Sequence, residues 1–246
     1  MTGPATWPRR LSEIPALVLA GGAGTRLRPA VPDRPKALAE IAGRPFLEHL
    51  LERLAAEGIV RAILCTGVMG DQVARWAARY SGPVELALSH ESEPAGTGGA
   101  VALARRRFGL ERTLVLNGDT YFEAPLAPLL AAASAAGAPG ALLAVRVPDT
   151  GRYGALETDA AGRVLRFVEK GQRGPGLISA GAALLGPEIL AAIPDDRPVS
   201  LEDEVLAAWA GRGLVAAVGE GRFVDIGTPE SYRAAEEMFA GTGGVR

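Results

Sequence analysis

A glycine-rich segment near the N-terminus has the residue types of a phosphate-binding loop. Residues 17–38, LVLAGGAGTRLRPAVPDRPKAL, place four apolar residues before Gly21, Gly22 and Gly24. Glycines let the backbone approach a ligand closely, and they expose N–H donors that suit phosphate oxygens. The segment therefore predicts a strand followed by a polyphosphate-binding loop, with a plain glycine turn as the alternative.

Two cations follow this loop and strengthen the phosphate interpretation. Arg26 and Lys36 suit a triphosphate and the pyrophosphate that leaves it. The loop is not a Walker motif, because no lysine follows in the spacing G-x-x-x-x-G-K-[ST]. It is not the dinucleotide fingerprint either, because Leu27 stands where the third glycine should be. Two solvated surface cations remain the alternative.

Two carboxylates follow predicted strands far apart in the sequence. Asp119 comes after the apolar run TLVLN at 113–117, and Asp225 leaves the short strand of GRFVDIGTPE. A carboxylate at the end of a buried strand faces a cleft, where it can bind Mg²⁺. Two such residues can share one metal, although an aspartate after a strand also commonly caps a turn.

Alternating strands and helices must position these residues. In the first half, we expect strands at 16–20, 61–67, 84–89 and 113–117, and helices over 44–58, 71–82 and 97–109. This alternation predicts a mainly parallel sheet with helices on both faces. Ligands of such sheets sit beyond the carboxyl ends of the strands, where the glycine loop and Asp119 both fall.

The second half is richer in strands. We expect strands at 140–147, 153–159, 162–170, 177–186, 214–219 and 222–227, the last two closing the sheet, and helices near 187–193, 200–212 and 229–240. Residues 1–12 are expected to be a flexible tail before one domain over 13–241. That domain has a nucleotide-binding part at about 13–137 and a sugar-binding part at about 138–241, with a short loop at 134–140 as the weakest seam.

The composition is that of a globular protein and excludes several classes of partner. Of 246 residues, 48% are hydrophobic and 5% aromatic, and the formal net charge is -2. This balance argues against a nucleic-acid binder, and no apolar stretch is long enough to span a membrane. Cys65, in an apolar run, is expected to be a buried thiol in a cytoplasmic protein. The oligomeric state stays open, a homo-oligomer included.

Six motifs, in order, resemble those of one protein family. They are LAGGAGTRLRP…RPKAL, EPAGTGGA, LVLNGDT, FVEK, ISAG and FVDIGTPE, between about residues 14 and 240. Together they resemble the sugar-1-phosphate nucleotidyltransferases. The resemblance implies a single-domain α/β fold with a Rossmann-like, mixed but mainly parallel sheet flanked by helices, similar to glycosyltransferase-A folds. It also implies an enzyme that joins a nucleoside triphosphate to a sugar 1-phosphate, giving an NDP-sugar and pyrophosphate with Mg²⁺.

The same resemblance implies roles for residues on the nucleotide side. The base, ribose and phosphates would be held by Ala20, Gly21, Gly22, Gly24 and Thr25, with Gly96, Thr97 and Gly98 under the base and ribose. Among the catalytic residues, Arg26 would grip the β- and γ-phosphates and Lys36 would face the α-phosphate. Asp119 and Asp225 would hold Mg²⁺ between the nucleotide and the sugar phosphate.

On the sugar side, the resemblance implies a second set of contacts. Gly154, Glu169 and Ser179 would contact sugar hydroxyls, with Asn117 beside them, and Lys170 would contact the sugar phosphate. The chain has Ser179-Ala180-Gly181 where the family normally has Asn-Ala-Gly, so the identity of the sugar is open. An anionic phosphate oxygen needs no general base, only positioning and charge neutralisation. His49 and His90 are therefore not needed for the chemistry.

Within the family, several segments narrow the resemblance. RPAVPDRPKALAEIAGRPFLEHLL, GTGGA, RPVSLEDEVL and FVDIGTPESYRAAEE look most like D-glycero-D-manno-heptose 1-phosphate guanylyltransferases. SHESEPAGTGGAVALAR is also similar to mannose-1-phosphate guanylyltransferases, which usually carry an additional β-helix that this chain is too short to contain. N-acetylmuramate-1-phosphate uridylyltransferases are the nearest rival, and they tend to have a glutamate where this chain has Gly96.

Glu91 is the candidate for reading the base. It is expected to end the strand VELALSHE, five residues before Gly96. Guanine presents adjacent N1–H and N2–H₂ donors that one carboxylate can accept together, whereas uracil presents one N–H between two carbonyl oxygens. This predicts a preference for GTP over UTP, with a solvated Glu91 and backbone reading of the base as the alternative.

Two other classes of protein stay open. A catalytically silent sugar-nucleotide sensor would be expected to lack Arg26, Lys36, Asp119 or Asp225, all of which are present. A glycosyltransferase of similar architecture would normally show an Asp-x-Asp metal motif, whereas NGDTYF has one aspartate.

Overall fold

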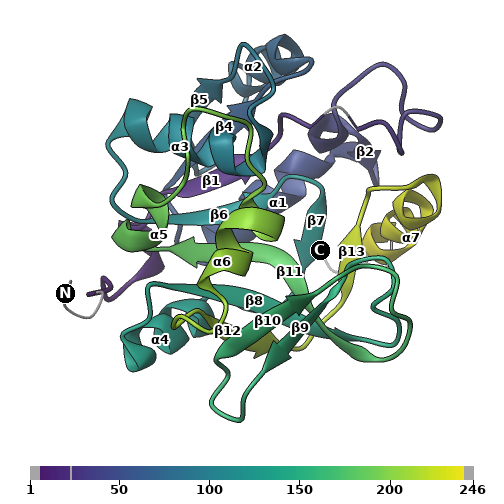
Figure 1. Ribbon diagram of the computed structural model, residues 1–246. Helices are drawn as coiled ribbons and strands as arrows, with labels where there is room; N and C mark the ends of the chain where they lie inside the picture. Colours follow the sequence, from purple (N-terminus) through teal and green to yellow (C-terminus); the bar gives the residue numbers. More distant parts are fainter. Residues whose placement is uncertain (1–5, 23, 241–246) are drawn as a thin grey trace.

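A seven-stranded sheet forms the centre of the computed structural model, which describes residues 6–22 and 24–240 (Figure 1). Its strands, in spatial order, are β12 (Val215–Gly219), β8 (Gly140–Val147), β11 (Gly176–Leu185), β6 (Thr113–Asn117), β1 (Ala16–Leu19), β4 (Arg61–Thr66) and β5 (Glu85–His90). β6, β1, β4 and β5 run parallel to one another, and β12 is parallel to β8. Only β11 is antiparallel to the strands beside it. The mixed, mainly parallel α/β sheet predicted from the sequence is therefore confirmed.

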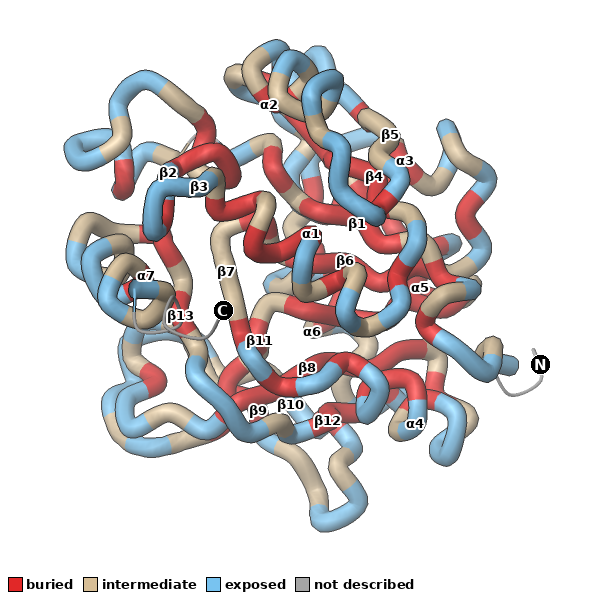
Figure 2. Tube along the Cα trace, turned by 180° about the vertical axis from the view of Figure 1, so that it is seen from behind, coloured by how far each residue is buried: buried red, intermediate tan, exposed pale blue. Residues whose placement is uncertain are grey.

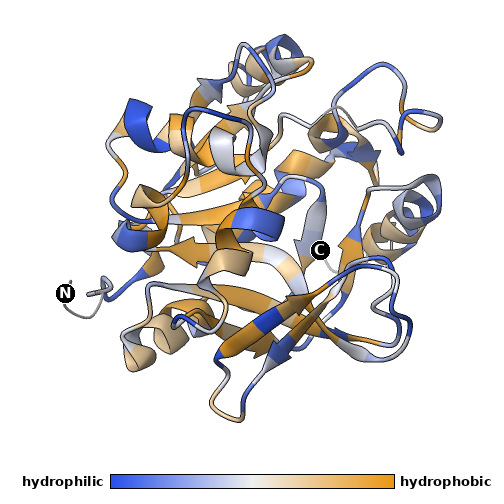
Figure 3. Ribbon diagram, viewed as in Figure 1, coloured by the Kyte–Doolittle hydropathy of each residue, from blue (hydrophilic) through white to orange (hydrophobic). Residues whose placement is uncertain are grey.

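Two apolar cores lie on the two faces of this sheet. Along β1, Ala16 and Val18 belong to one core and Leu17 to the other, as expected when successive side chains alternate across a strand. Figure 2 shows the buried residues concentrated along the central strands, and Figure 3 shows that the same strands are the most apolar part of the chain. Burying both faces explains why these strands are continuous apolar runs.

Helices contribute to both cores. The helices are α1 (Phe46–Ala56), α2 (Gly70–Ala77), α3 (Gly96–Phe108), α4 (Ala127–Ala136), α5 (Pro187–Ala191), α6 (Ala207–Trp209) and α7 (Pro229–Ala240), with 3₁₀ turns η1 (Leu11–Glu13) and η2 (Lys36–Leu38) and a π-helix, η3 (Leu201–Leu206). Leu50 of α1, Leu129 of α4 and Ala235 of α7 join one core. Val101 of α3 and Val205 of η3 join the other. No helix in the described part of the chain is both long and apolar enough to cross a membrane.

Three two-stranded ladders lie outside the central sheet. They pair β2 (Glu40–Ile41) with β3 (Arg44–Pro45), β9 (Ala155–Thr158) with β10 (Val164–Val168), and β7 (Thr120–Phe122) with β13 (Phe223–Asp225). The last ladder is antiparallel and sets Asp225 opposite Thr120, beside Asp119. The expectation that residues 222–227 close the central sheet is therefore wrong, because β13 pairs with β7 instead.

Two other expectations differ from the structure. The segment 134–140 was expected to be a loop, but its first residues complete α4, which ends where Gly137 takes a left-handed conformation with φ +55°. Of the tail expected over residues 1–12, residues 1–5 lie outside the described residues. From Trp7 onward the chain is attached, because Trp7 Nε1 donates to the Ala138 carbonyl over 2.9 Å and Leu11 is buried.

Candidate active site

A cleft of about 450 Å³ opens at the carboxyl ends of β1 and β6. These strands run parallel in register, with Leu19 beside Asn117, so the residues that follow them meet at one edge of the sheet. The predicted site residues that line the cleft are Ala20, Gly21, Gly22, Lys36, Glu91, Gly96, Thr97, Asn117 and Asp119. A wider hollow of about 670 Å³ lies over α1 and α2 and contains no predicted site residue.

The glycines of the loop are needed for close packing. A Cβ atom on Gly21 would lie 2.9 Å from the Gly67 nitrogen, so the two loops that follow β1 and β4 touch through their backbones. Gly24 has φ +62°, and a Cβ there would lie 3.1 Å from Lys36 Cγ. The loop therefore both exposes its backbone and supports the stem of Lys36. Thr25 and Arg26 are exposed at its outer end.

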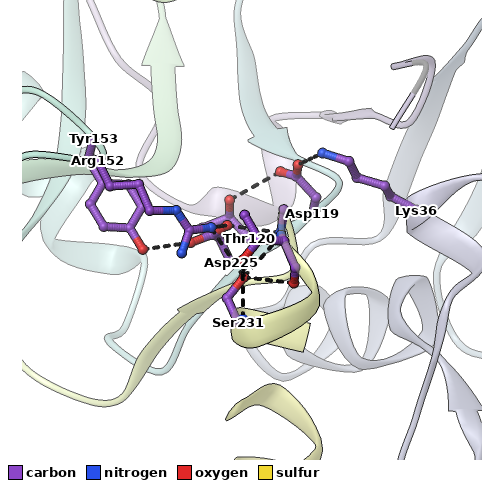
Figure 4. A network of polar contacts seen from close by, with 9 residues as sticks. Lys36, Asp119, Thr120, Arg152, Tyr153, Asp225 and Ser231 are labelled. Atoms are coloured by element: carbon purple, nitrogen blue, oxygen red, sulfur yellow. Dashed lines mark hydrogen bonds and ion pairs between the residues drawn. The ribbon is translucent and has the colours of Figure 1, made fainter. Parts of the chain in front are cut away.

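Lys36 and Asp119 form an ion pair in the cleft (Figure 4). Lys36 begins the turn η2, and its Nζ donates to Asp119 Oδ2 over 3.0 Å. The two side chains keep 18% and 33% of their exposure, so both remain accessible to a ligand. Thr120 Oγ1 donates to the other carboxylate oxygen over 3.3 Å. A cation predicted to face a phosphate and a carboxylate predicted to bind a metal are thus side by side.

Asp225 is held by donors that the sequence did not reveal. Arg152 Nη2 donates to its Oδ1, Tyr153 OH donates to its Oδ2 over 2.6 Å, and the Gly227 N–H donates to Oδ1 over 2.9 Å. Its side chain keeps only 12% of its exposure. Burial and the neighbouring Asp225 carboxylate both raise the pKa of the Tyr153 hydroxyl, which therefore stays protonated as a donor.

Two further contacts tie the Asp225 turn to the rest of the site. The Ile226 N–H donates to the Asp119 carbonyl over 2.8 Å. A Cβ on Gly227 would lie 3.8 Å from Arg26 Nη2 and 3.5 Å from Arg152 Nη2. Arg26 therefore reaches toward Asp225, and the loop cation and the two aspartates belong to one region although Arg26 and Asp225 do not line the cleft.

The two aspartates form a donor set that Mg²⁺ accepts. Mg²⁺ commonly takes one or two protein carboxylates and completes its shell with water and substrate phosphates. Among the described residues there is no group of three or more His, Cys, Asp or Glu side chains that could hold a metal. An ion bound between Asp119 and Asp225 would therefore take its other ligands from water and phosphate oxygens.

A strap over residues 198–201 closes the cleft above the N-terminus of α3. The Val199 N–H donates to the Ala95 carbonyl, the Gly98 N–H donates to the Val199 carbonyl, and Leu201 N donates to Thr97 Oγ1, over 2.8–2.9 Å. Gly96 and Thr97 begin α3 rather than a loop. Gly98 is buried against Val199. Its N–H donates to the strap and its Cα packs on the Val199 side chain, so neither is available to a ligand. The structure does not bring Gly98 into the cleft.

Glu91 lies at the back of the cleft. Its Oε1 packs so closely against the loops that a Cβ on Gly67 would lie 2.7 Å away and one on Gly21 3.3 Å away. Its Oε2 is buried and has no hydrogen-bond partner among the described residues. Burial raises the pKa of Glu91, against the Ala95 backbone N–H and His90, which favour the charged form. A buried acceptor without a partner is what a ligand donor would satisfy.

The residues expected on the sugar side lie on β11 and the β9–β10 hairpin. Ser179 Oγ donates to Glu202 Oε1 over 3.4 Å. Gly154 has φ +79°, and a Cβ there would lie 2.7 Å from the Val168 carbonyl and 3.6 Å from Lys170 Cγ. Glu169 and Lys170 are exposed. None of these four predicted residues lines the cleft itself, so the structure groups them beside it.

Sequence reasoning missed Arg152, Tyr153 and Glu202. Arg152 and Tyr153 directly precede Gly154, and Glu202 lies in the quoted segment RPVSLEDEVL, but neither stretch showed which side chains would turn inward. Cys65 also borders the cleft, and burial raises its thiol pKa to about 12, so it is the unreactive thiol that was expected.

Comparisons with known proteins agree with this arrangement. The profile of the nucleotidyl transferase family matches residues 15–240. Over 93% of its length the chain is 36% identical to mannose-1-phosphate guanylyltransferase of Mycobacterium tuberculosis, and over 91% it is 35% identical to mannose-1-phosphate guanylyltransferase 1 of Arabidopsis thaliana. It spans 66% and 64% of the lengths of these two relatives.

Among solved structures, HddC from Yersinia pseudotuberculosis complexed with GMP-PN superposes with a TM-score of 0.80 at 33% identity. The match covers 92% of this chain and 99% of that one. A putative glucose-1-phosphate thymidylyltransferase from Bacillus anthracis shares the fold, with a TM-score of 0.77 at 21% identity. With the family profile spanning the site and nearly the whole chain, the protein belongs to the nucleotidyl transferase family.

Proposed function

We propose that this protein transfers GMP from GTP to a sugar 1-phosphate, releasing pyrophosphate and forming a GDP-sugar. The observation that carries the proposal is the convergence on one cleft of the glycine loop, the Lys36–Asp119 pair and Glu91, whose Oε2 has no hydrogen-bond partner among the described residues. Family membership supports nucleotidyl transfer, and relatives that are guanylyltransferases support GTP as the donor.

The reaction needs charge neutralisation more than acid–base chemistry. An oxygen of the sugar phosphate attacks the α-phosphorus, and the bond from that phosphorus to the bridging oxygen of the β-phosphate breaks. The electron pair of that bond leaves with pyrophosphate. Lys36 neutralises charge on the α-phosphate, and Arg26, near Gly227, binds the departing pyrophosphate. The attacking oxygen is already anionic, so no proton needs to be removed.

Asp119 and Asp225 would hold Mg²⁺. The ion supplies charge neutralisation and fixes the relative orientation of the two substrates. Lys36, Arg152 and Tyr153 contact these carboxylates in the structure and keep them oriented. The Arg152 guanidinium would be a third cation for the phosphates, after Lys36 and Arg26.

Glu91 would select the base. A carboxylate accepts both the N1–H and the N2–H₂ of guanine, whereas uracil offers it a single donor flanked by carbonyl oxygens. A mismatch of this kind costs about 1–3 kcal/mol, which corresponds to a preference of roughly ten- to hundredfold for GTP. The buried Oε2 without a partner supports this role.

The sugar is proposed to be D-glycero-D-manno-heptose 1-phosphate, with mannose 1-phosphate as the second candidate. The segment RPVSLEDEVL and the ending FVDIGTPESYRAAEE favour the heptose, whereas the names of the curated relatives favour mannose. Both sugars have the manno configuration of the ring, so one site could bind either.

A pyrophosphate-release assay tests this proposal. The purified protein is given GTP or UTP, with Mg²⁺ and heptose, mannose, glucose or N-acetylmuramate 1-phosphate. We expect the highest kcat/KM with the heptose or mannose ester, and a GDP-sugar of matching mass as product. Release of pyrophosphate only with N-acetylmuramate 1-phosphate and UTP would instead identify the rival uridylyltransferase.

A further inference from the structure

One carboxylate of the cleft has no part in the nucleotide and metal roles above. Glu202 lines the cleft from η3. Ser179 Oγ lies 3.4 Å from its Oε1, and the Asn117 side chain slightly lowers the pKa of its carboxyl group. Among the described residues no cation forms an ion pair with Glu202, and Lys170 favours its charge only from a longer distance.

The strap fixes the position of Glu202. Residues on either side of it are tied down, because Leu201 N donates to Thr97 Oγ1 over 2.8 Å and the Asp203 N–H donates to Ser200 Oγ over 3.1 Å. The Val205 N–H donates to the Ser200 carbonyl over 3.2 Å, which is the wide turn of a π-helix. Such turns are rare and frequently occur at functional sites.

The surroundings of Glu202 do not favour its charge. Burial raises its pKa, and Asp203 raises it further, against smaller opposing effects of Lys170, Ser179 and Asn117. A carboxylate kept only for stability would have a cation or several N–H donors around it. A carboxylate that is disfavoured in the free protein and faces a cleft is typical of a position that serves a ligand.

We infer that Glu202 selects the sugar, because its carboxylate can accept hydrogen bonds from hydroxyls of a sugar 1-phosphate that carries no charged substituent besides the phosphate. This inference rests on the proposed function. The two carboxylate oxygens can accept from two neighbouring hydroxyls at once. Ser179, which is shorter than an asparagine, reaches Glu202 with its single hydroxyl and orients it.

The same geometry disfavours sugars with an acidic substituent. A second carboxylate near Glu202 and Asp203 would meet like charges, with only the more distant Lys170 to offset them. The site therefore suits hydroxyl-rich neutral sugars and would exclude N-acetylmuramate and uronic acids, whose carboxylates would be repelled.

Steady-state kinetics of Glu202→Gln test the inference. Glutamine keeps the shape but loses the charge and one acceptor oxygen. The matched control is Glu204→Gln, two residues further along η3, whose side chain points away from the cleft to Arg197 and the Ser200 N–H. Substrates are GTP with heptose 1-phosphate and with mannose 1-phosphate, the monodeoxy analogues of mannose 1-phosphate, and mannuronic acid 1-phosphate.

For Glu202→Gln we expect the KM of the sugar phosphate to rise about ten- to hundredfold, the range for a hydrogen bond to a charged group. The KM of GTP should stay within twofold of the wild-type value. In Glu204→Gln, the KM of GTP and the KM of the sugar phosphate should both stay within twofold of the wild type. The wild type should discriminate against one or two monodeoxy analogues, and Glu202→Gln should lose that discrimination and gain turnover of mannuronic acid 1-phosphate.

Three results would overturn the inference. They are an unchanged KM for the sugar phosphate, a parallel rise of both KM values, and an unchanged profile of monodeoxy analogues in Glu202→Gln. Failure of the proposed function looks different, because the wild type itself would then release no pyrophosphate with any sugar phosphate, and the inference would fall with it.

Discussion

Among single residues, Lys36 gives the most specific prediction about catalysis. It is the one cation that lines the cleft within the described chain, and its ammonium lies 3.0 Å from Asp119. Lys36→Met should lower kcat by about 10²–10³-fold, as expected when one preorganised electrostatic contact to the transition state is lost. The free energy of unfolding should change by less than about 1 kcal/mol, because the ion pair is partly exposed.

Arg75→Met is the control for this substitution, since Arg75 forms an exposed ion pair with Asp71 on α2. Pyrophosphate release measures kcat, and urea titration measures stability. A Lys36→Met variant with kcat within twofold of the wild type would remove Lys36 from the catalytic account.

Asp225 should matter both for metal use and for stability. Asp225→Asn should raise the Mg²⁺ concentration for half-maximal rate at least about tenfold, since Mg²⁺ prefers carboxylate oxygens. It should also cost about 1–3 kcal/mol of stability, because Arg152 loses its counter-ion and Tyr153 keeps a weaker acceptor.

Tyr153→Phe separates the two effects on Asp225. It should lose part of the stability while its Mg²⁺ requirement stays near that of the wild type. A chelator should abolish pyrophosphate release in both the wild type and this variant. Equal Mg²⁺ requirements in Asp225→Asn and the wild type would contradict a metal-binding role for Asp225.

Among single residues, the sequence predicted the glycine loop, Asp119 and Glu91 because each lies at a strand end. It predicted Lys36 because this cation follows the glycine loop. It could not reveal Arg152, Tyr153 or Glu202. Their contacts join residues 72 and 73 positions apart for Asp225 and 23 apart for Ser179, and they exist only once the β13–β7 ladder and η3 have formed. Gly98 was expected to contact the ligand. Its packing against Val199, which lies about a hundred residues further along the chain, could not be seen in the sequence either.

Among the elements, η3 holds Glu202 in surroundings that disfavour its charge. This should lower the free energy of unfolding by an amount that depends on pH. Burial raises the folded-state pKa of Glu202 above its ordinary value of 4.5, so the folded protein binds this proton more tightly than the unfolded chain. Stability from this group is therefore present below pH 4.5 and is lost as pH rises through the raised pKa. Glutamine carries no such penalty.

Glu202→Gln should consequently be more stable than the wild type at pH 7.5, and this gain should disappear near pH 4. Urea denaturation of both proteins at the two pH values measures the difference, and Glu204→Gln again serves as the control. If Glu202→Gln is less stable than the wild type by the same amount at both pH values, Glu202 stabilises the folded protein, and the expected destabilisation is absent.

Most helices and strands were predictable, but the short strands β2, β3 and β7, the helix α4 and the partner of β13 were not. α4 has the sequence APLLAAASAA, in which alanines on every face hide the helical period, so no helix was expected there. β13 was expected to close the central sheet because a three-residue apolar strand carries no signal about its partner. Only its register with β7 brings Asp225 next to Asp119.

For the whole molecule, the structure joins the two predicted parts in one cleft. Residues of the first part supply the glycine loop, Lys36 and Asp119, and the second part supplies Ser200 to Asp203 through the strap. The strap contacts the start of α3 at Ala95, Thr97 and Gly98. The residues proposed to bind the nucleotide and those proposed to bind the sugar are therefore in direct contact. The alternation of strands and helices predicted the α/β architecture. It did not predict that residues 198–201 of the second part would pack on α3 of the first part.

The most direct measurement is kcat/KM for GTP and UTP with the same sugar 1-phosphate, in the wild type and in Glu91→Gln. The account predicts that the wild type prefers GTP by roughly ten- to hundredfold. Glu91→Gln should narrow that preference, because an amide can both donate and accept. A wild type that prefers UTP would contradict guanylyl transfer, and an unchanged ratio in the variant would remove Glu91 from the reading of the base.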